Sequence, residues 1–79
     1  MGTRLVPVSV DFPGGSYAIT WDFNDGGWRF TVKSITGRQY SHSFNIARNR
    51  FLDGLQHAFT KAAEHARVAQ LAEAQVSNT

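Results

Sequence analysis

The chain has no cysteine and only two prolines and one methionine among its 79 residues. Without cysteine it can form neither a disulfide nor a zinc site built on thiolates. No apolar run approaches the roughly 20 residues that a membrane-spanning helix needs, and the first residues show no signal-peptide core. We therefore expect a cytoplasmic protein that does not enter a membrane.

Charge is also scarce, and neither half of the chain has an excess of one sign. Eight Lys and Arg stand against six Asp and Glu, for a formal net charge of +2. Residues 1–44 and residues 45–79 each hold four basic and three acidic side chains. This balance gives little support for a broad basic surface that would hold nucleic acid by charge alone.

The first half of the chain alternates between apolar and polar residues with a period of two, which is typical of strands with one buried face. Four apolar runs show this alternation: Val6 to Phe12, Tyr17 to Phe23, Trp28 to Val32 and Tyr40 to Phe44. Glycine-containing turns at residues 13–15, 24–27 and 36–37 separate the runs. Because the connections are short, the sequence predicts an antiparallel meander in the order 1-2-3-4 over residues 4–45.

The second half reads as a single helix over about residues 47–75, with a frayed tail at residues 76–79. At 100° per residue, one stripe of the helix is apolar, with Leu52 at its margin: Phe51, Leu55, Ala58, Phe59, Ala62, Ala66 and Ala69. Either Asn45 or Asn49 could cap the helix start. Gly54 costs about 1 kcal/mol relative to alanine inside a helix, which points to an irregular turn or a close approach to another backbone.

These elements make one α+β domain over residues 1–79, a four-stranded sheet with one face covered by a C-terminal helix (ββββα). The predicted main core combines aromatic and aliphatic side chains from both elements: Trp21, Trp28, Phe30, Phe51, Leu55 and Phe59. The helix would be roughly 43 Å long, whereas a strand of about seven residues spans roughly 23 Å. We expect the helix to extend past its sheet, which makes Val68 and Leu71 candidates for self-association as a homodimer.

The histidines are the residues most open to a chemical interpretation. His42 falls in the inward register of the last strand, where we expect a partly buried side chain. His57 and His65 are eight residues apart, too far for the one-turn pairing of a zinc-binding helix, and we expect both to be solvated. Asp53 could pair with His57 one turn later. The sequence predicts no catalytic residue, no metal and no cofactor, and so a non-enzymatic protein.

Four antiparallel strands followed by a helix resemble, in order of elements, the single-stranded-DNA-binding domain of the transcriptional positive-cofactor family. The resemblance implies a dimer that grips single strands with basic and aromatic side chains. In this chain the aromatic residues share the register that the helix must cover, so the opposite face offers basic and small polar side chains without rings to stack on bases. The candidate contacts for nucleic acid or for another partner are Arg29, Lys33, Arg38, Arg48 and Arg50.

In size and style the chain also resembles small accessory proteins of phages and mobile elements, among them anti-CRISPR proteins. That resemblance implies an inhibitor that docks on a host protein or nucleoprotein complex, such as a CRISPR effector, and blocks it sterically. We take this docking protein as the leading hypothesis. A small single-stranded nucleic-acid-binding protein of the β4α type is the alternative.

Overall fold

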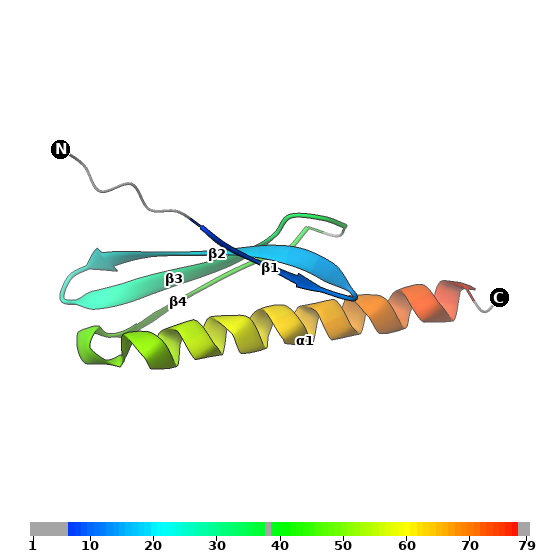
Figure 1. Cartoon of the computed structure of the whole chain (residues 1–79). Coiled ribbons are helices and arrows are strands. Elements are labelled where there is room, and N and C mark those ends of the chain that lie inside the picture. Colours follow the sequence, from blue (N-terminus) through cyan, green and yellow to red (C-terminus); the bar gives the residue numbers. More distant parts are fainter. Residues whose placement is uncertain (1–6, 38, 78–79) are drawn as a thin grey trace.

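The glycine-containing turns divide the first half of the chain into four strands, and one helix follows them. The computed structural model describes residues 7–37 and 39–77, the last five of them by their backbone alone. The elements are β1 (Val8–Phe12), β2 (Gly15–Asn24), β3 (Gly27–Ser34), β4 (Ser41–Ala47), the short 3-10 helix η1 (Arg48–Arg50) and α1 (Phe51–Ser77). Figure 1 shows the sheet as one layer and α1 as the other. The predicted ββββα architecture is confirmed.

The four strands form one antiparallel sheet in the order β1-β2-β3-β4. The turn between β2 and β3 has the geometry of a two-residue hairpin, with Asp25 at φ 54° and Gly26 at φ 76°. Asn24 and Gly27 are paired on either side of this turn. These turn residues set the β2–β3 register, which places Trp21 opposite Phe30. In the next pairing, Phe30 lies opposite Phe44 of β4.

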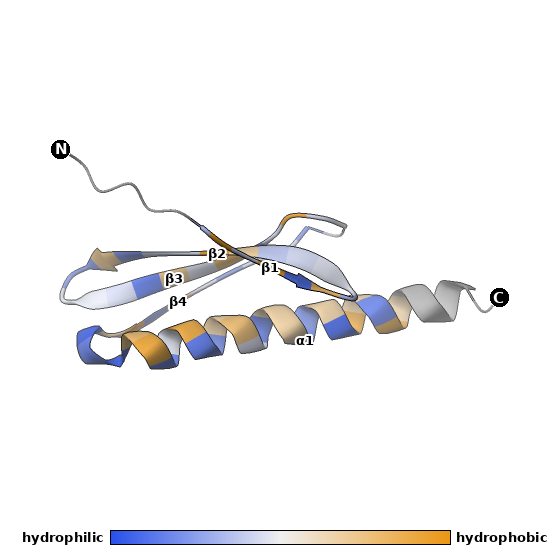
Figure 2. Ribbon diagram, viewed as in Figure 1, coloured by the Kyte–Doolittle hydropathy of each residue, from blue (hydrophilic) through white to orange (hydrophobic). Residues whose placement is uncertain are grey.

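The alternation along each strand sorts the side chains into an inner face toward α1 and an outer face that no described element covers (Figures 1 and 2). The inner positions of the two central strands are the most deeply buried: Tyr17, Ile19, Phe30 and Val32. The outer positions are small or polar, as at Thr20, Thr31 and Ser43. One buried and one open face is the usual arrangement of an antiparallel sheet.

Of the six residues predicted to form the main core, Phe30 is fully buried. The other five pack around the core and are only partly buried. On the helix side the fully buried side chains are those of three alanines, Ala58, Ala62 and Ala66, in line with the buried Gly54. Their small side chains let α1 lie close to β2 and β3. The bulkier residues are only partly buried and surround this contact: Trp21, Trp28, Phe51, Leu55 and Phe59.

Two glycines mark where helix and sheet come closest. A Cβ on Gly54 would lie 2.9 Å from Cζ of Phe30 and 3.0 Å from Cγ2 of Ile46, and closer still to Cε1 of Phe30. A Cβ on Gly14, in the turn after β1, would collide with the carbonyl group of Ala66. Gly54 therefore marks a close approach, as one reading of the sequence predicted, although its neighbours are side chains instead of a backbone.

The helix begins later than the sequence predicted, because β4 continues to Ala47 before η1 intervenes. Asn45 lies within β4, and no side chain caps η1, whose N-terminal flanking residue is Ala47. Neither asparagine therefore acts as the predicted cap. At the other end α1 extends past the β1–β2 turn (Figure 1), and the molecule measures 52 × 25 × 15 Å. The predicted overhang is present.

Candidate functional site

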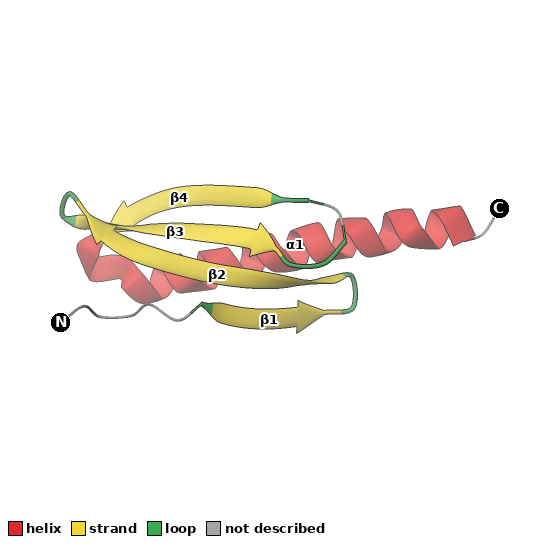
Figure 3. Cartoon of the chain, turned by 90° about the horizontal axis from the view of Figure 1, so that it is seen from above, coloured by secondary structure: helices red, strands yellow, loops and turns green. Residues whose placement is uncertain are grey.

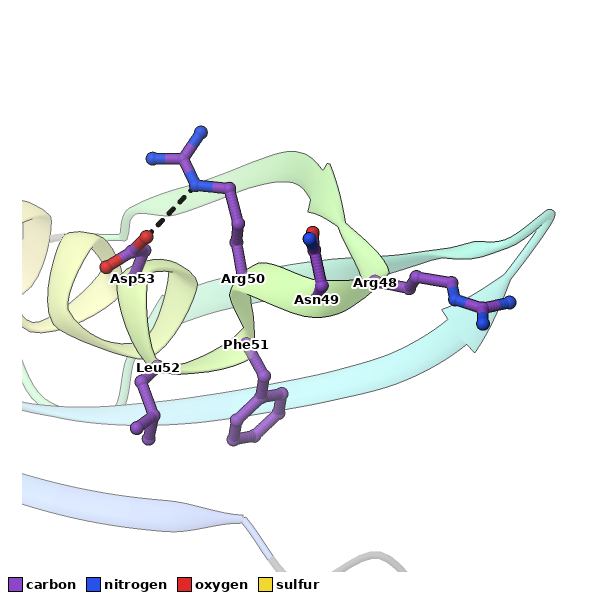
Figure 4. Close-up of a pocket in the computed structure, with 6 residues that line it drawn as sticks. All are labelled: Arg48, Asn49, Arg50, Phe51, Leu52 and Asp53. Carbon is purple, nitrogen blue, oxygen red and sulfur yellow. Dashed lines mark hydrogen bonds and ion pairs between the residues drawn. The ribbon is translucent and has the colours of Figure 1, made fainter.

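A group of four apolar side chains lies where η1 leads into α1, two of them exposed and two half-buried. Phe23 and Trp28 lie opposite each other on β2 and β3, with ring centroids 5.1 Å apart, and Trp28 lies 4.9 Å from the ring of Phe51. Leu52 projects on the same side as Phe51 (Figure 4). Phe23 is 53% exposed and Leu52 is 76% exposed. We call Phe23, Trp28, Phe51 and Leu52 the helix-start patch.

The local structure holds this patch in place from two sides. The indole Nε1 of Trp28 donates a hydrogen bond of 3.0 Å to the carbonyl oxygen of Arg48, which ties β3 to η1. Nε of Arg50 donates to Oδ2 of Asp53 at 3.0 Å, across the junction between η1 and α1. In Figure 4, Arg50 and Asp53 point away from Phe51 and Leu52. The junction therefore separates a charged side from an apolar side.

The structure corrects the predicted pairing of Asp53 with His57, because the carboxylate of Asp53 accepts from Arg50 instead. Residues 48–53 also line a shallow cavity of about 260 Å³. Blue, hydrophilic residues of η1 and the orange first turn of α1 adjoin there (Figure 2). Such a surface can bind a partner that offers an apolar side chain together with an acidic or carbonyl group.

The five predicted basic contacts do not form one stripe. Arg48 and Arg50 both lie in η1, whereas Arg29 and Lys33 lie on the outer face of β3. Arg29 is at the η1 end, and Lys33 is four residues along the strand, roughly 13 Å away. Arg38 lies outside the described residues. The structure therefore brings Arg29, Arg48 and Arg50 to one end of the sheet and leaves Lys33 near the other end of β3.

Acidic residues accompany the described arginines. Asp22 is directly opposite Arg29 in the β2–β3 register, and Asp53 pairs with Arg50. Arg29 and Asp25 line the same small cavity beside the hairpin turn. These neighbours reduce the local positive potential, so a run of phosphates would meet a weaker field than the arginines alone would provide.

The histidines lie along the flank between β4 and α1, in contact with aromatic rings. His57 meets Phe44 edge-on with centroids 4.6 Å apart, and His42 lies 5.8 Å from the same ring. His65 stacks on Tyr40 at 4.0 Å, and its Nδ1 lies 2.6 Å from the hydroxyl of Tyr17. The prediction that His65 is solvated is wrong. It lies three residues after the buried Ala62, at the border of the core stripe, and that spacing could have indicated a contact with the sheet.

The tyrosines beside His65 respond to their surroundings. Burial raises the pKa of Tyr17, and the nearby Tyr40 adds to the rise. Burial also raises the pKa of Tyr40, with the Glu64 carboxylate as the second cause. Tyr17 is only 1% exposed, whereas a general acid or base must come within hydrogen-bond reach of a substrate. The pair of Tyr17 and His65 therefore fastens the helix to the sheet.

The overhang begins beyond the contact between Gly14 and Ala66. Val68 is 65% exposed and Leu71 is 55% exposed, and both lie outside the alanine stripe that meets the sheet. Val68 also lines a cavity of about 260 Å³ on the β4 flank, together with Tyr40, His42 and Lys61. Both predicted self-association residues are thus available for contact, and their role stays a prediction.

No family model, no curated protein and no solved structure matches the chain. Among residues 7–37 and 39–72, whose side chains the structure describes, the histidines and carboxylates do not gather into a group of three that could hold a metal ion. Over the same described residues, α1 lacks the apolar length that crossing a membrane requires.

Proposed function

We propose that the chain is a non-enzymatic binding protein that docks on a larger protein or nucleoprotein complex through the helix-start patch. The observation that carries this proposal is the exposure of Phe23 and Leu52 at the edge of a fixed aromatic group. Leu52 in particular lies in the first turn of α1, where its apolar neighbours Phe51 and Leu55 pack against the core. The Leu52 side chain, which is 76% exposed, contributes little to the packing of the described residues.

The composition and rigidity of the patch suit protein recognition. Aromatic residues and arginine are enriched at the centres of protein interfaces, and here Arg48 and Arg50 border the apolar side chains. The hydrogen bond from Trp28 to Arg48 and the ion pair of Arg50 with Asp53 hold η1 before any partner arrives. Such preorganisation reduces the entropy lost on binding.

The proposed mechanism is steric: a bound copy covers a surface that the complex needs, and no turnover follows. A CRISPR effector as the complex, a phage or mobile element as the source and the cytoplasm as the compartment stay predictions from the sequence. The exposure of Phe23 and Leu52 supports the helix-start patch as the surface for that contact.

A single-stranded nucleic-acid-binding protein is the second candidate, and the exposure of Phe23 favours it. The alternation predicts that every ring of the inner register lies under the helix, and for Phe23 this is wrong. Its ring lies near the end of β2, against Trp28, and is 53% exposed. One exposed ring near Arg48 could stack on a base while the arginine contacts a phosphate.

The test compares Leu52→Asp with Leu71→Asp, a matched change of an exposed leucine at the other end of α1. Each tagged protein is incubated with nuclease-treated host lysate and with purified candidate effector complexes. A complex held by the wild type and by Leu71→Asp but lost by Leu52→Asp supports the proposal. A complex that Leu52→Asp retains in full would overturn it.

The nucleic-acid alternative has its own measurement, the anisotropy of a labelled single-stranded oligonucleotide at about 150 mM salt. Phosphate-driven binding weakens steeply as salt rises. A sub-micromolar dissociation constant with that salt dependence, weakened at least tenfold in Phe23→Ala and Arg48→Ala, would establish the alternative in place of protein docking.

A further inference from the structure

The two edges of the sheet differ in how well they are protected against pairing. Because the strand order is β1-β2-β3-β4, β1 and β4 each have one side without a neighbouring strand among the described residues (Figure 3). Natural edge strands are commonly short, charged or interrupted by proline, which prevents pairing with another chain. β1 has these features: it is five residues long, carries Asp11 and is followed by Pro13.

β4 has none of these protections. It spans seven residues, Ser41–Ala47, with the sequence SHSFNIA, which includes no charged residue, no proline and no glycine. Its pairing with β3 is continuous from Ser41 to Ala47. A regular, uncharged edge of this length is a template for another strand.

The inner side chains of β4 are also less covered than those of its neighbour. His42, Phe44 and Ile46 are half-buried, whereas Phe30 and Val32 on β3 are fully buried. The reason is that α1 lies mainly over β2 and β3, with β4 to one side (Figure 3). A further strand beside β4 would bury more of this aromatic surface.

We infer that β4 pairs antiparallel with β4 of a second copy of this chain, so that one continuous sheet crosses both copies. With the two-fold axis at Phe44, the middle of the strand, Phe44 meets the partner's Phe44. His42 then lies opposite the partner's Ile46, and Ser43 lies opposite the partner's Asn45. Every pair is uncharged, and the central aromatic pair is a favourable cross-strand combination.

The sequence of β4 favours a second copy as the occupant of this edge. Lys61 and Glu64 lie beside Tyr40, just before β4, and pair with each other at 3.8 Å. The strand itself is uncharged from Ser41 to Ala47. In the two-fold register identical residues meet at Phe44 and no charges are brought together, so the strand is complementary to itself.

This inference goes beyond the proposed function and leaves the helix-start patch free. Leu52 and His57 are five residues apart on α1, which places them about 140° apart around the helix axis. His57 contacts Phe44 on the β4 flank, so Leu52 projects toward the opposite flank. A dimer could present two copies of the patch to a larger complex.

The test uses charge at Ser43 and Asn45, which are exposed on the outer face. The variants are Ser43→Lys with Asn45→Lys, and Ser43→Glu with Asn45→Glu; each puts like charges opposite each other across the two-fold axis. Sedimentation equilibrium at about 50 µM should give twice the 8.8 kDa chain mass for the wild type. Each variant alone should dimerise at least tenfold more weakly, and an equal mixture should recover the dimer.

Matched changes on the other edge, Ser9→Lys with Asp11→Lys, should leave the dimer intact, as should Leu52→Asp. A monomeric wild type would overturn the inference. So would a dimer that persists in both charged β4 variants, or one that disappears in Val68→Lys with Leu71→Lys. Circular dichroism checks that each variant is folded. Should the β4 variants fail to fold, amide exchange on the wild type decides: β4 amides should be protected more at about 100 µM than at about 1 µM.

Discussion

The hydroxyl of Tyr17 lies 2.6 Å from Nδ1 of His65, across 48 positions of sequence, and joins the second strand to the middle of the helix. The two rings meet edge-on with centroids 5.7 Å apart, and Tyr40 closes the other side of the imidazole. This contact is a polar interaction within the mainly apolar interface between α1 and the sheet.

Removing the hydroxyl should weaken the fold modestly. Tyr17→Phe keeps the ring packing but leaves His65 without its partner, so we expect a loss of about 1 kcal/mol in the free energy of unfolding. Urea unfolding followed by tryptophan fluorescence measures it. His65→Phe serves as the paired variant, and the double variant should cost less than the sum of the two single changes. Strict additivity would show that the hydrogen bond contributes nothing.

Stability should fall in alkaline solution because of Tyr17 and Tyr40. The pKa of each phenol is raised above its ordinary value of 10.0, chiefly by burial, so the folded chain holds these protons more tightly than the unfolded chain. The free energy of unfolding is therefore fully retained below about pH 10 and decreases as pH rises through the folded-state pKa values. Urea unfolding at about pH 8 and about pH 11 tests this, and Tyr17→Phe should flatten the decrease. Equal stability at both pH values would contradict the prediction.

Phe30 should matter more than Phe59, although the sequence placed both in the main core. Phe30 is fully buried and Phe59 is only partly buried at the margin. Phe30→Ala should cost about 3–5 kcal/mol, a large share of what a small domain has. Phe59→Ala should cost clearly less. Thermal melting of the two variants side by side gives the order, and the reverse order would place the centre of the core elsewhere.

Gly54→Ala should destabilise the protein even though alanine is the better helix former. The gain in helix propensity is about 1 kcal/mol, but the added methyl group would press on the ring of Phe30 and on Ile46. Overpacking of this kind costs about 1–3 kcal/mol. In a Phe30→Leu background the same change should become less costly or favourable. An equal cost of Gly54→Ala in both backgrounds would argue against the contact.

Gly14→Ala should also destabilise, by displacing α1 from the β1–β2 turn. The new methyl group would meet the carbonyl of Ala66, and a backbone group cannot rotate away as a side chain can. We expect a loss of about 1–3 kcal/mol in chemical unfolding. Gly37→Asn is the matched control, since Gly37 has φ 72° in open space, where asparagine is tolerated. If both variants melted at the wild-type temperature, the helix would not rest on this turn.

The period-two alternation of apolar and polar residues, together with the glycine-containing turns, was enough to predict the strands and their order. One-face alternation and three short turns leave little freedom for a chain of this length, and the Asp25-Gly26 turn appears as expected. The burial of individual residues was harder to predict, because it depends on where the helix crosses the sheet. Ala58, Ala62 and Ala66 bring α1 down onto β2 and β3, and no periodicity in the sequence locates that crossing along the strands.

The candidate site was predicted only in part, for a related reason. Arg48 and Arg50 were singled out by charge, and the structure places them beside the helix-start patch. Phe23 was predicted to lie under the helix. Alternation shows which face of the sheet a residue lies on, but it does not show how far along the strand the helix covers that face. The contacts of His65 with Tyr17 and Tyr40 depend on tertiary packing across long stretches of chain.

The crossing of Gly14 and Ala66 divides α1 into a supported part and an unsupported one. From Leu71 to Ser77 the helix continues for roughly 10 Å beyond the residues that line cavities together with the sheet. This part relies on the local helix preference of its alanines, and isolated helical stretches of that length are marginal in water. Backbone amides there should exchange with solvent long before those of Ala58 and Ala62. Helical ellipticity should accordingly begin to fade on warming while tryptophan fluorescence still reports a folded sheet.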